Sequence, residues 1–129
     1  MKGLAVVVDN DPLTRRIVAG RLQRAGFVVT EAAGATEALS RVDELIPDVI
    51  VTDIALPRMD GWELIARLRF DKRTARIPIV VVTSGIGLGP GPEGVSRLLV
   101  KPDDLARLAD EVHAAIAEVH GPDRKWRGQ

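Results

Sequence analysis

Short apolar runs alternate with amphipathic stretches along nearly the whole chain. The runs are rich in β-branched residues, and several are apolar almost throughout. Such runs are typical of short strands that a sheet buries on both faces. We therefore predict five strands, over Leu4–Val8, Phe27–Ala32, Asp48–Asp53, Ile77–Ser84 and Ser96–Val100.

The stretches between the strands repeat apolar residues at helical spacing and carry the end signals of helices. In the first, Asp11 is a good N-cap, Pro12 stands at the first helical position and Gly26 is a good stop. The expected apolar stripe of this helix consists of Leu13, Ile17, Val18, Leu22 and Ala25. Three further helices are predicted over 35–45, 61–71 and Asp103–His120, the last capped by Asp103 or Asp104.

The order of these elements predicts the architecture. Strands and helices alternate, except that a glycine-proline segment stands between the last two strands. Alternation of this kind indicates an α/β fold, a doubly wound parallel sheet of five strands with helices on both faces. The third helix would turn Trp62, Ile65 and Leu68 toward the sheet, with Arg69 or Phe70 near the same side. In such a sheet, function sits beyond the carboxyl ends of the strands.

Composition narrows the classes of function. The chain has 129 residues, which fits one domain, and its 18 basic residues balance 18 acidic ones. A balanced charge gives no field that would attract nucleic acid or an anionic membrane. The chain has no cysteine, which excludes disulfides and thiolate chemistry and fits a reducing cytoplasm. We expect neither a membrane span nor a signal peptide ahead of Gly3.

Polar side chains stand at the carboxyl ends of four predicted strands. The first strand ends in Asp9–Asp11, the third in Asp53, the fourth in Thr83 and Ser84, and the fifth in Lys101. Because these ends share one edge of a parallel sheet, we expect carboxylates, a hydroxyl and an ammonium group to meet in one crevice.

The mixture of charges at this edge favours phosphoryl chemistry. Clustered carboxylates repel one another unless a cation offsets their charge, and oxygen ligands favour Mg²⁺. A lysine opposite them supplies a positive charge for a phosphoryl oxygen, and a carboxylate can attack phosphorus to form an acyl phosphate. Each residue also has a simpler explanation: Asp11 and Asp53 as caps, Thr83 as a strand end and Lys101 as a surface charge. The conjunction of the four strand ends favours phosphoryl transfer.

Four segments, in order and in register, resemble the receiver domains of two-component response regulators. They are an acidic turn, VVVDNDPLTRRIV; a phosphoacceptor segment, DVIVTDIALPRMDGWEL; a hydroxyl motif, PIVVVTS; and a Lys-Pro motif, LLVKPDDL. The resemblance covers about residues 3–120. It implies a flavodoxin-like sheet with strand order 2-1-3-4-5, a receiver domain over 1–120 and a flexible C-terminal tail over 121–129.

The resemblance also implies a role for each matching residue. Asp53 would be the phosphorylated aspartate, and Asp9 would be an acidic residue of the Mg²⁺ site. The backbone carbonyl of Ala55 would be a further Mg²⁺ ligand. Thr83 would bind a phosphoryl oxygen. Lys101 would pair with the phosphoryl group, and with Asp53 before phosphorylation.

One further position fits the family and two depart from it. Pro102, after a cis peptide bond as is usual in the family, would fix the turn that aims the lysine. Asn10 stands where the family usually has a second acidic metal ligand, so we expect weaker Mg²⁺ binding, for which Asp11 could compensate. Leu98 stands where the family usually has an aromatic residue that moves with the threonine, which puts that switch in doubt.

The segment from Ser84 to Ser96 falls where the family builds its fourth helix. It holds five glycines and two prolines, too many for more than a turn of helix. No Lys-Ser/Thr pair follows its glycines, so it is not a phosphate-binding loop. We predict a mobile or extended loop over Gly85–Gly94 in place of that helix.

The resemblance implies a phospho-accepting signalling domain and not an enzyme, beyond promoting its own phosphorylation and dephosphorylation. Its partners would be a sensor histidine kinase or a histidine phosphotransfer protein and an unknown downstream protein target in the cytoplasm, without direct contact to nucleic acid or membrane. The alternative is a pseudo-receiver, a phosphorylation-independent protein-binding module, which Asn10 and Leu98 favour. An aspartate-nucleophile phosphatase would need an acid at the position of Ala55, which argues against that third class.

Overall fold

The structure of the chain is a computed structural model that describes residues 3–84 and 94–120. Its strands form one parallel sheet in the order β2-β1-β3-β4-β5, as expected for a flavodoxin-like fold. Each strand is short; β1, β3 and β4 are buried along most of their length, whereas β2 and β5, at the two edges of the sheet, are only partly buried. The strands are β1 (Gly3–Val8), β2 (Phe27–Ala32), β3 (Val49–Thr52), β4 (Ile79–Thr83) and β5 (Arg97–Val100).

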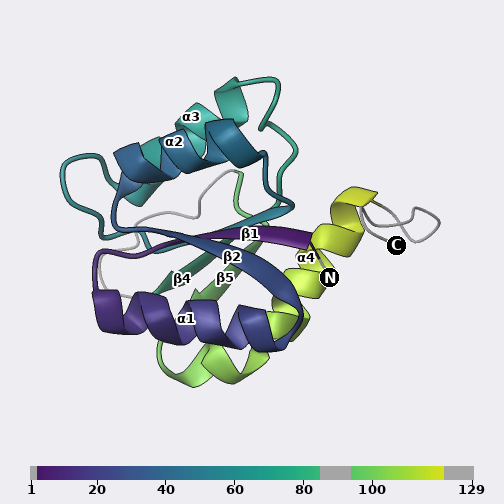
Figure 1. Cartoon of the computed structure of the whole chain (residues 1–129). Coiled ribbons are helices and arrows are strands. Elements are labelled where there is room, and N and C mark those ends of the chain that lie inside the picture. Colours follow the sequence, from purple (N-terminus) through teal and green to yellow (C-terminus); the bar gives the residue numbers. More distant parts are fainter. Residues whose placement is uncertain (1–2, 85–93, 121–129) are drawn as a thin grey trace.

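Helices cover both faces of the sheet. Figure 1 shows α2 and α3 above the sheet and α1 and α4 beneath it. This arrangement confirms the predicted doubly wound α/β architecture. The helices are α1 (Pro12–Arg24), α2 (Ala35–Leu45), α3 (Gly61–Phe70) and α4 (Leu108–His120), with a 3₁₀ turn, η1 (Asp103–Arg107), before the last.

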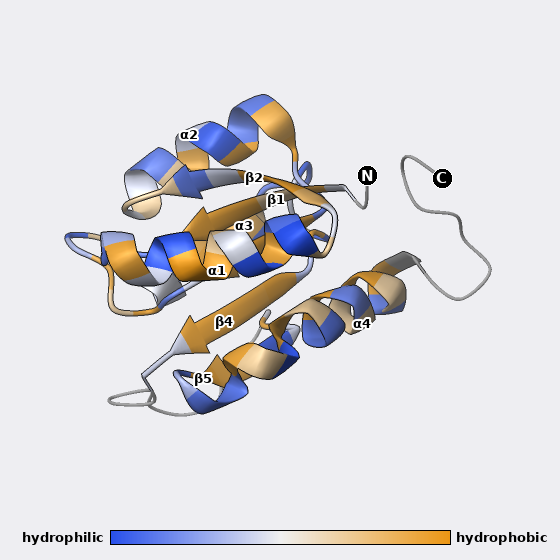
Figure 2. Cartoon of the chain, turned by 60° about the horizontal axis from the view of Figure 1, so that its bottom comes forward, coloured by the Kyte–Doolittle hydropathy of each residue, from blue (hydrophilic) through white to orange (hydrophobic). Residues whose placement is uncertain are grey.

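Alternation of side chains along the strands divides the core in two. Val81 and its neighbours on one face pack beneath α2 and α3, and Val82 and its neighbours on the other face pack against α1 and α4. Figure 2 shows the strands as predominantly hydrophobic and the helices as mixed. Because both faces are covered, the central strands are apolar throughout, which is why their sequence shows no alternation.

The first helix confirms the predicted cap and part of the predicted apolar stripe, and it corrects two members of that stripe. Asp11 is the N-cap of α1, and its side chain accepts hydrogen bonds from the backbone of residues 13 and 14. Leu13, however, is 69% exposed and Ile17 is 42% exposed. The buried face is centred on Val18 and Leu22, and Leu13 lies about 140° around the helix from Val18.

The C-terminal end of α3 also differs from the prediction. Leu68 is buried as expected, but Phe70, two positions further on, is 93% exposed because it points away from the sheet. Arg69 lies between the two and its guanidinium donates to the carbonyl oxygens of Ala75, Ile77 and Gly94. The half-buried arginine thereby ties α3 to the chain just before β5.

The last helix begins later than its sequence predicts. Asp103 and Asp104 do not cap a continuous helix but belong to η1, and α4 starts only at Leu108. The physical reason is the direction of the Asp104 carboxylate, whose Oδ2 accepts a hydrogen bond from the Val100 backbone N–H at 2.8 Å. That carboxylate caps the end of β5 instead of the start of the helix.

Two predictions lie wholly or almost wholly outside the described residues. The loop predicted over Gly85–Gly94 is described only at Gly94, and the tail predicted over 121–129 is not described. Both stay predictions. Within the described part of the chain, no helix is both long and apolar enough to cross a membrane.

Candidate functional site

The carboxyl ends of β1, β3, β4 and β5 bring the predicted site residues to one edge of the sheet. Asp9 and Asp53 follow directly after β1 and β3, and Thr83 is the last residue of β4. Lys101 follows β5 and its backbone N–H donates to the Thr83 carbonyl at 2.7 Å. The lysine ammonium group reaches across to both aspartates. Residues far apart in the sequence thus form one acidic cluster with a lysine beside it.

Asp53 is held at the centre of this cluster. Its Oδ1 accepts hydrogen bonds from the backbone N–H groups of Ile54, at 2.6 Å, and Ala55, at 3.2 Å. Its Oδ2 accepts from the Lys101 ammonium at 3.0 Å. The residue is only 9% exposed. Both oxygens are therefore oriented, one by backbone and one by a single side-chain cation.

Asp9 is fixed in a similar way from the neighbouring strand. Its Oδ1 accepts from the Asp11 backbone N–H at 2.9 Å, and its Oδ2 accepts from the Lys101 ammonium at 3.0 Å. Arg15, one turn into α1, donates to the Asp9 carbonyl at 2.9 Å and pairs with Glu31 on β2. The acidic turn is thus held by its own backbone and by a neighbouring arginine.

Lys101 supplies the positive charge of the site. Burial alone would lower the pKa of its ammonium group, but the hydrogen bonds that it donates to Asp53 and Asp9, and the attraction of their charges, outweigh burial and raise the pKa. The lysine is therefore fully charged at neutral pH. The peptide bond between Lys101 and Pro102 is cis, as the resemblance implied.

Thr83 and Leu98 lie on neighbouring strands near the acidic cluster. Thr83 is 2% exposed at the end of β4, whereas Leu98 on β5 is 42% exposed. Leu98 pairs in register with Val81, so its side chain lies on the same face of the sheet as α2 and α3. The position that the family usually gives to an aromatic residue therefore holds an exposed leucine.

The oxygen atoms at this edge suit one divalent cation. Asp9 and Asp53 already share one positive charge, and Mg²⁺ sites in proteins commonly use one or two carboxylates with carbonyl oxygens and water. Asn10 is exposed beside them, and the backbone of Ala55 is in contact with the Asp53 carboxylate. The described residues contain no group of three or more acidic or histidine side chains that could hold a metal. The donors fit Mg²⁺, with one charge fewer than a site built on three carboxylates.

Asp11 is committed to another task. Its carboxylate accepts hydrogen bonds from the Thr14 hydroxyl and from the backbone at the start of α1. The hydrogen bond from Thr14 is the main cause that lowers the pKa of this exposed carboxyl. Metal binding by Asp11 would have to compete with this cap.

Gly61 allows the loop after Asp53 to close against α3. A Cβ atom at this position would lie 2.6 Å from the Asp53 carbonyl oxygen and 2.6 Å from the Ile54 Cα. The Gly61 N–H donates to the Ile54 carbonyl at 2.8 Å. The glycine at the start of α3 is thus required by close backbone approach.

Sequence reasoning missed two residues that shape the site. Arg15 holds the acidic turn through the Asp9 carbonyl, and Asp104 holds the end of β5, next to Lys101, through the Val100 N–H. The only local signal was spacing: Asp104 follows Val100 by four residues and Arg15 follows Asp9 by six. Neither spacing alone distinguishes a support from a solvated surface charge.

Comparison with known proteins identifies the family. A family model described as the response regulator receiver domain matches residues 5–113, which is most of the chain. The chain therefore belongs to the family of response regulator receiver domains. The strand order, the acidic edge and the opposing lysine are all consistent with that membership.

Individual relatives agree with this assignment. The response regulator Rre1 of Synechocystis is 32% identical over 116 residues, which cover 86% of this chain and 48% of that protein. A sensor protein from Polaromonas has a structure with a TM-score of 0.85 and 30% identity, covering 92% of this chain and 99% of that one. The regulator TrrA of Thermotoga maritima, solved with Mg²⁺ and BeF, has a TM-score of 0.79 and 24% identity over 89% of this chain and 99% of that one, which shows the fold alone. This chain spans between 7% and 60% of the length of four curated relatives, Rre1 among them.

Proposed function

We propose that this receiver domain accepts a phosphoryl group on Asp53 and signals through protein contacts. The observation that carries the proposal is the bridge from Lys101 to both Asp53 and Asp9, with 3.0 Å to an oxygen of each. A lysine held there places a positive charge where the oxygens of a phosphoryl group on Asp53 would lie. Such charge is what phosphoryl transfer needs from a protein.

The transfer step follows from the orientation of the Asp53 carboxylate. Backbone N–H groups hold Oδ1, which leaves Oδ2, on the side of Lys101, to attack phosphorus. A bond forms between Oδ2 and the phosphorus of a phosphohistidine, and the phosphorus–nitrogen bond breaks. Its electron pair stays on the imidazole nitrogen, which takes a proton from solvent. Lys101 then neutralises the charge of one phosphoryl oxygen, and the hydroxyl of Thr83 binds another.

A divalent cation completes the charge balance. Mg²⁺, when bound, shields the negative charge of the aspartates and of the incoming phosphoryl group. Asp9 and Asp53 would hold it through their carboxylates, with the Asn10 amide oxygen and the Ala55 carbonyl as further ligands. Because Asn10 carries no charge, we expect binding weaker than at a site with three carboxylates.

The phosphoryl donor would be a sensor histidine kinase or a histidine phosphotransfer protein, and the output would be an altered contact with a downstream protein in the cytoplasm. The chain would act on no other substrate. It would promote only its own phosphorylation and the hydrolysis of its acyl phosphate, in which water releases inorganic phosphate and regenerates Asp53.

A pseudo-receiver is the second candidate, and two observations favour it. Leu98 is 42% exposed and has no hydroxyl to take part in a threonine-coupled switch, and Asn10 removes one charge from the metal site. A module of this kind would bind its partner without phosphorylation. Absence of Mg²⁺ binding at millimolar concentration would support it.

Beryllofluoride, a phosphoryl mimic, tests the proposal directly. In Mg²⁺, its addition should shift the amide NMR signals around Asp53, Thr83 and Lys101. Asp53→Asn should abolish these shifts. Asp60→Asn is the matched control, because Asp60 caps α3 through the Glu63 N–H and asparagine is an equally good cap. Shifts that are absent, or that persist in Asp53→Asn, would exclude phosphoryl acceptance at this residue.

A further inference from the structure

A hollow of about 270 Å³ lies at the edge of the sheet opposite the acidic cluster. It is placed where β3 and β4 begin, between the end of α2 and the end of α4. Its apolar walls are Ile46, Pro47, Ile77, Pro78 and Val119. We refer to it as the edge hollow. Its size suits a single large apolar side chain from another molecule.

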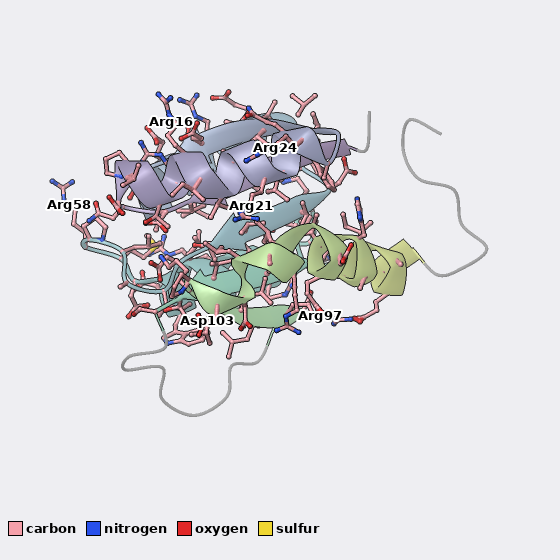
Figure 3. All side chains as sticks on the ribbon, turned by 90° about the horizontal axis from the view of Figure 1, so that it is seen from below. Arg16, Arg21, Arg24, Arg58, Arg97 and Asp103 are labelled. Atoms are coloured by element: carbon pink, nitrogen blue, oxygen red, sulfur yellow. The ribbon has the colours of Figure 1, made fainter. Side chains whose placement is uncertain are left out.

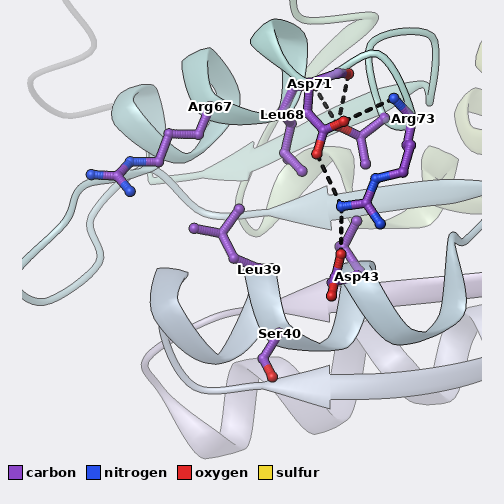
Figure 4. Close-up of a pocket in the computed structure, with 9 residues that line it drawn as sticks. Leu39, Ser40, Asp43, Arg67, Leu68, Asp71 and Arg73 are labelled. Carbon is purple, nitrogen blue, oxygen red and sulfur yellow. Dashed lines mark hydrogen bonds and ion pairs between the residues drawn. The ribbon is translucent and has the colours of Figure 1, made fainter.

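Three cationic residues, Lys72, Arg73 and Arg76, also line the edge hollow. Arg73 is already committed, because Asp43 and Asp71 hold its guanidinium from two sides, as Figure 4 shows. Lys72 and Arg76 are exposed, and neither forms an ion pair within residues 3–84 and 94–120. Two positive charges therefore stand beside an apolar recess without an ion-pair partner in the described chain.

One carboxylate lines the same hollow and does not cancel this charge. Asp48 is only 6% exposed, and its Oδ2 accepts a hydrogen bond from the Leu4 backbone N–H at 2.7 Å. It is directed into the start of the sheet. The accessible rim is therefore positive, and the recess it surrounds is apolar.

Ile46 gives a second reason to regard the edge hollow as a built feature. It ends α2 with φ of 43°, in the left-handed region, where glycine or asparagine is the usual residue. A β-branched residue there is a genuine outlier, and such strain concentrates at functional sites. The chain tolerates the strain and keeps an apolar side chain in the wall of the hollow.

We propose that the edge hollow docks an acidic protein segment that inserts an apolar side chain between the cations Lys72 and Arg76. The charge of the rim selects the occupant. The chain's own last residues, 121–129, hold three basic residues and one acidic residue, so they share the sign of the rim. Nucleic acid would favour aromatic side chains for stacking, and none of the residues that line the hollow is aromatic. A flat membrane surface does not fill a recess.

This docking surface goes beyond the proposed phosphoryl chemistry. It lies at the amino ends of the strands, whereas Asp53 lies at the carboxyl end of β3. Docking at the edge hollow would therefore tether a partner in either phosphorylation state. The Asp53→Asn variant should dock as well as the unaltered chain, so failure of one proposal leaves the other standing.

The test uses the full chain and a fluorescein-labelled acidic peptide with a central pair of leucines. We expect saturable binding by fluorescence anisotropy, with NMR shifts at Ile46, Ile77 and Val119. The affinity of the double variant Lys72→Glu/Arg76→Glu for the peptide should be lower by a factor of about ten or more. The matched control, Arg21→Glu/Arg24→Glu, changes the net charge equally on α1, a separate surface seen in Figure 3, and should bind normally.

Further binding measurements decide for or against the proposal. The same peptide with serines in place of the leucines should lose binding, because the recess is apolar. Three results would overturn the proposal: no peptide binding, equal loss in both double variants, or binding of the serine peptide as tight as that of the leucine peptide. Two other results would assign the hollow to a different occupant. The first is preferential binding to phosphatidylglycerol vesicles or to single-stranded oligothymidine. The second is that the NMR shifts arise because the peptide displaces the chain's own residues 121–129.

Discussion

The ammonium nitrogen of Lys101 lies 3.0 Å from Oδ2 of Asp9 and 3.0 Å from Oδ2 of Asp53. One cation thus offsets two carboxylates that come from different strands and are both nearly buried. This relationship explains why a fold would place two like charges together at the edge of its sheet. It also makes the lysine a structural residue as well as a site residue.

Removing this lysine should destabilise the fold. In Lys101→Met the two carboxylates face each other without a cation, and breaking such a nearly buried set costs about 3 kcal/mol in the free energy of unfolding. Urea denaturation at neutral pH measures it. Lys72→Met is the control, since Lys72 is exposed and should change stability by less than about 0.5 kcal/mol. Equal stability of the two variants would contradict the role of the bridge.

The lysine bridge also predicts a pH dependence. The pKa of Lys101 is raised above its usual value of 10.5, because its bonds to Asp53 and Asp9 outweigh the effect of burial. A group whose pKa is higher in the folded state stabilises the fold fully below its unfolded pKa and loses that effect as the pH rises through its folded pKa. The difference in unfolding free energy between the unaltered chain and Lys101→Met should therefore stay constant from neutral pH to about pH 10 and shrink at higher pH. A difference that shrinks between pH 7 and 9 would be inconsistent with the raised pKa.

Replacing Asn10 with an acidic residue should strengthen Mg²⁺ binding. Asn10→Asp adds a third carboxylate beside Asp9 and Asp53, and we expect the Mg²⁺ affinity to rise about tenfold by calorimetric titration. Asp11→Asn separates capping from ligation, because asparagine keeps the cap of α1 and loses the charge. If Asp11 only caps, this variant binds Mg²⁺ almost as tightly as the unaltered chain. A strong loss would make Asp11 a ligand.

Gly61, which packs against the loop after Asp53, should not tolerate a methyl group. Gly61→Ala places a Cβ 2.6 Å from backbone atoms of Asp53 and Ile54, which must shift, at a cost of about 3 kcal/mol. Gly20→Ala is the matched control in the middle of α1, where the nearest atom to the new Cβ is a flexible arginine nitrogen at 3.8 Å. That variant should be more stable by about 1 kcal/mol, because glycine is a poor helix former. Thermal denaturation of both variants tests whether Gly61→Ala is less stable and Gly20→Ala more stable than the unaltered chain.

Arg69 should stabilise β5, the strand that Lys101 follows. Its guanidinium donates to carbonyls of Ala75, Ile77 and Gly94, and Gly94 has φ of 87° with its Cα hydrogen facing the arginine side chain. Arg69→Met leaves these carbonyls without a charged donor and should destabilise the chain by about 2 kcal/mol. Amide hydrogen exchange should then rise first at residues 94–97. Arg67→Met, which loses only an exposed pair with Glu63, is the control.

The sheet and the site could be predicted because their signals are local. Continuous apolar runs mark strands buried on both faces, and polar residues directly after those runs must meet at one edge of a parallel sheet. The sequence alone therefore predicts that one edge of the sheet holds Asp9, Asp53, Thr83 and Lys101. The doubly wound fold follows from the alternation of strands and helices alone.

Other features depend on contacts that no local pattern encodes. Leu13 and Phe70 are apolar, yet the sheet selects a different face of each helix, and both side chains are exposed. Asp104 has the right type and position for an N-cap, but its carboxylate binds the backbone of β5. Arg15 and Arg69 donate hydrogen bonds to backbone carbonyl oxygens. Because every residue has a backbone carbonyl, the sequence does not indicate which one each arginine binds.

We propose that Asp53 accepts a phosphoryl group while Lys101 and Asp9 hold the charge around it. The most direct test is intact-mass spectrometry after incubation with acetyl phosphate and Mg²⁺, followed by peptide mapping of the modified residue. We expect a mass gain of one phosphoryl group, located on Asp53, that requires Mg²⁺ and is absent in Asp53→Asn. An unmodified chain under these conditions, or a phosphoryl group on any other residue, would contradict it.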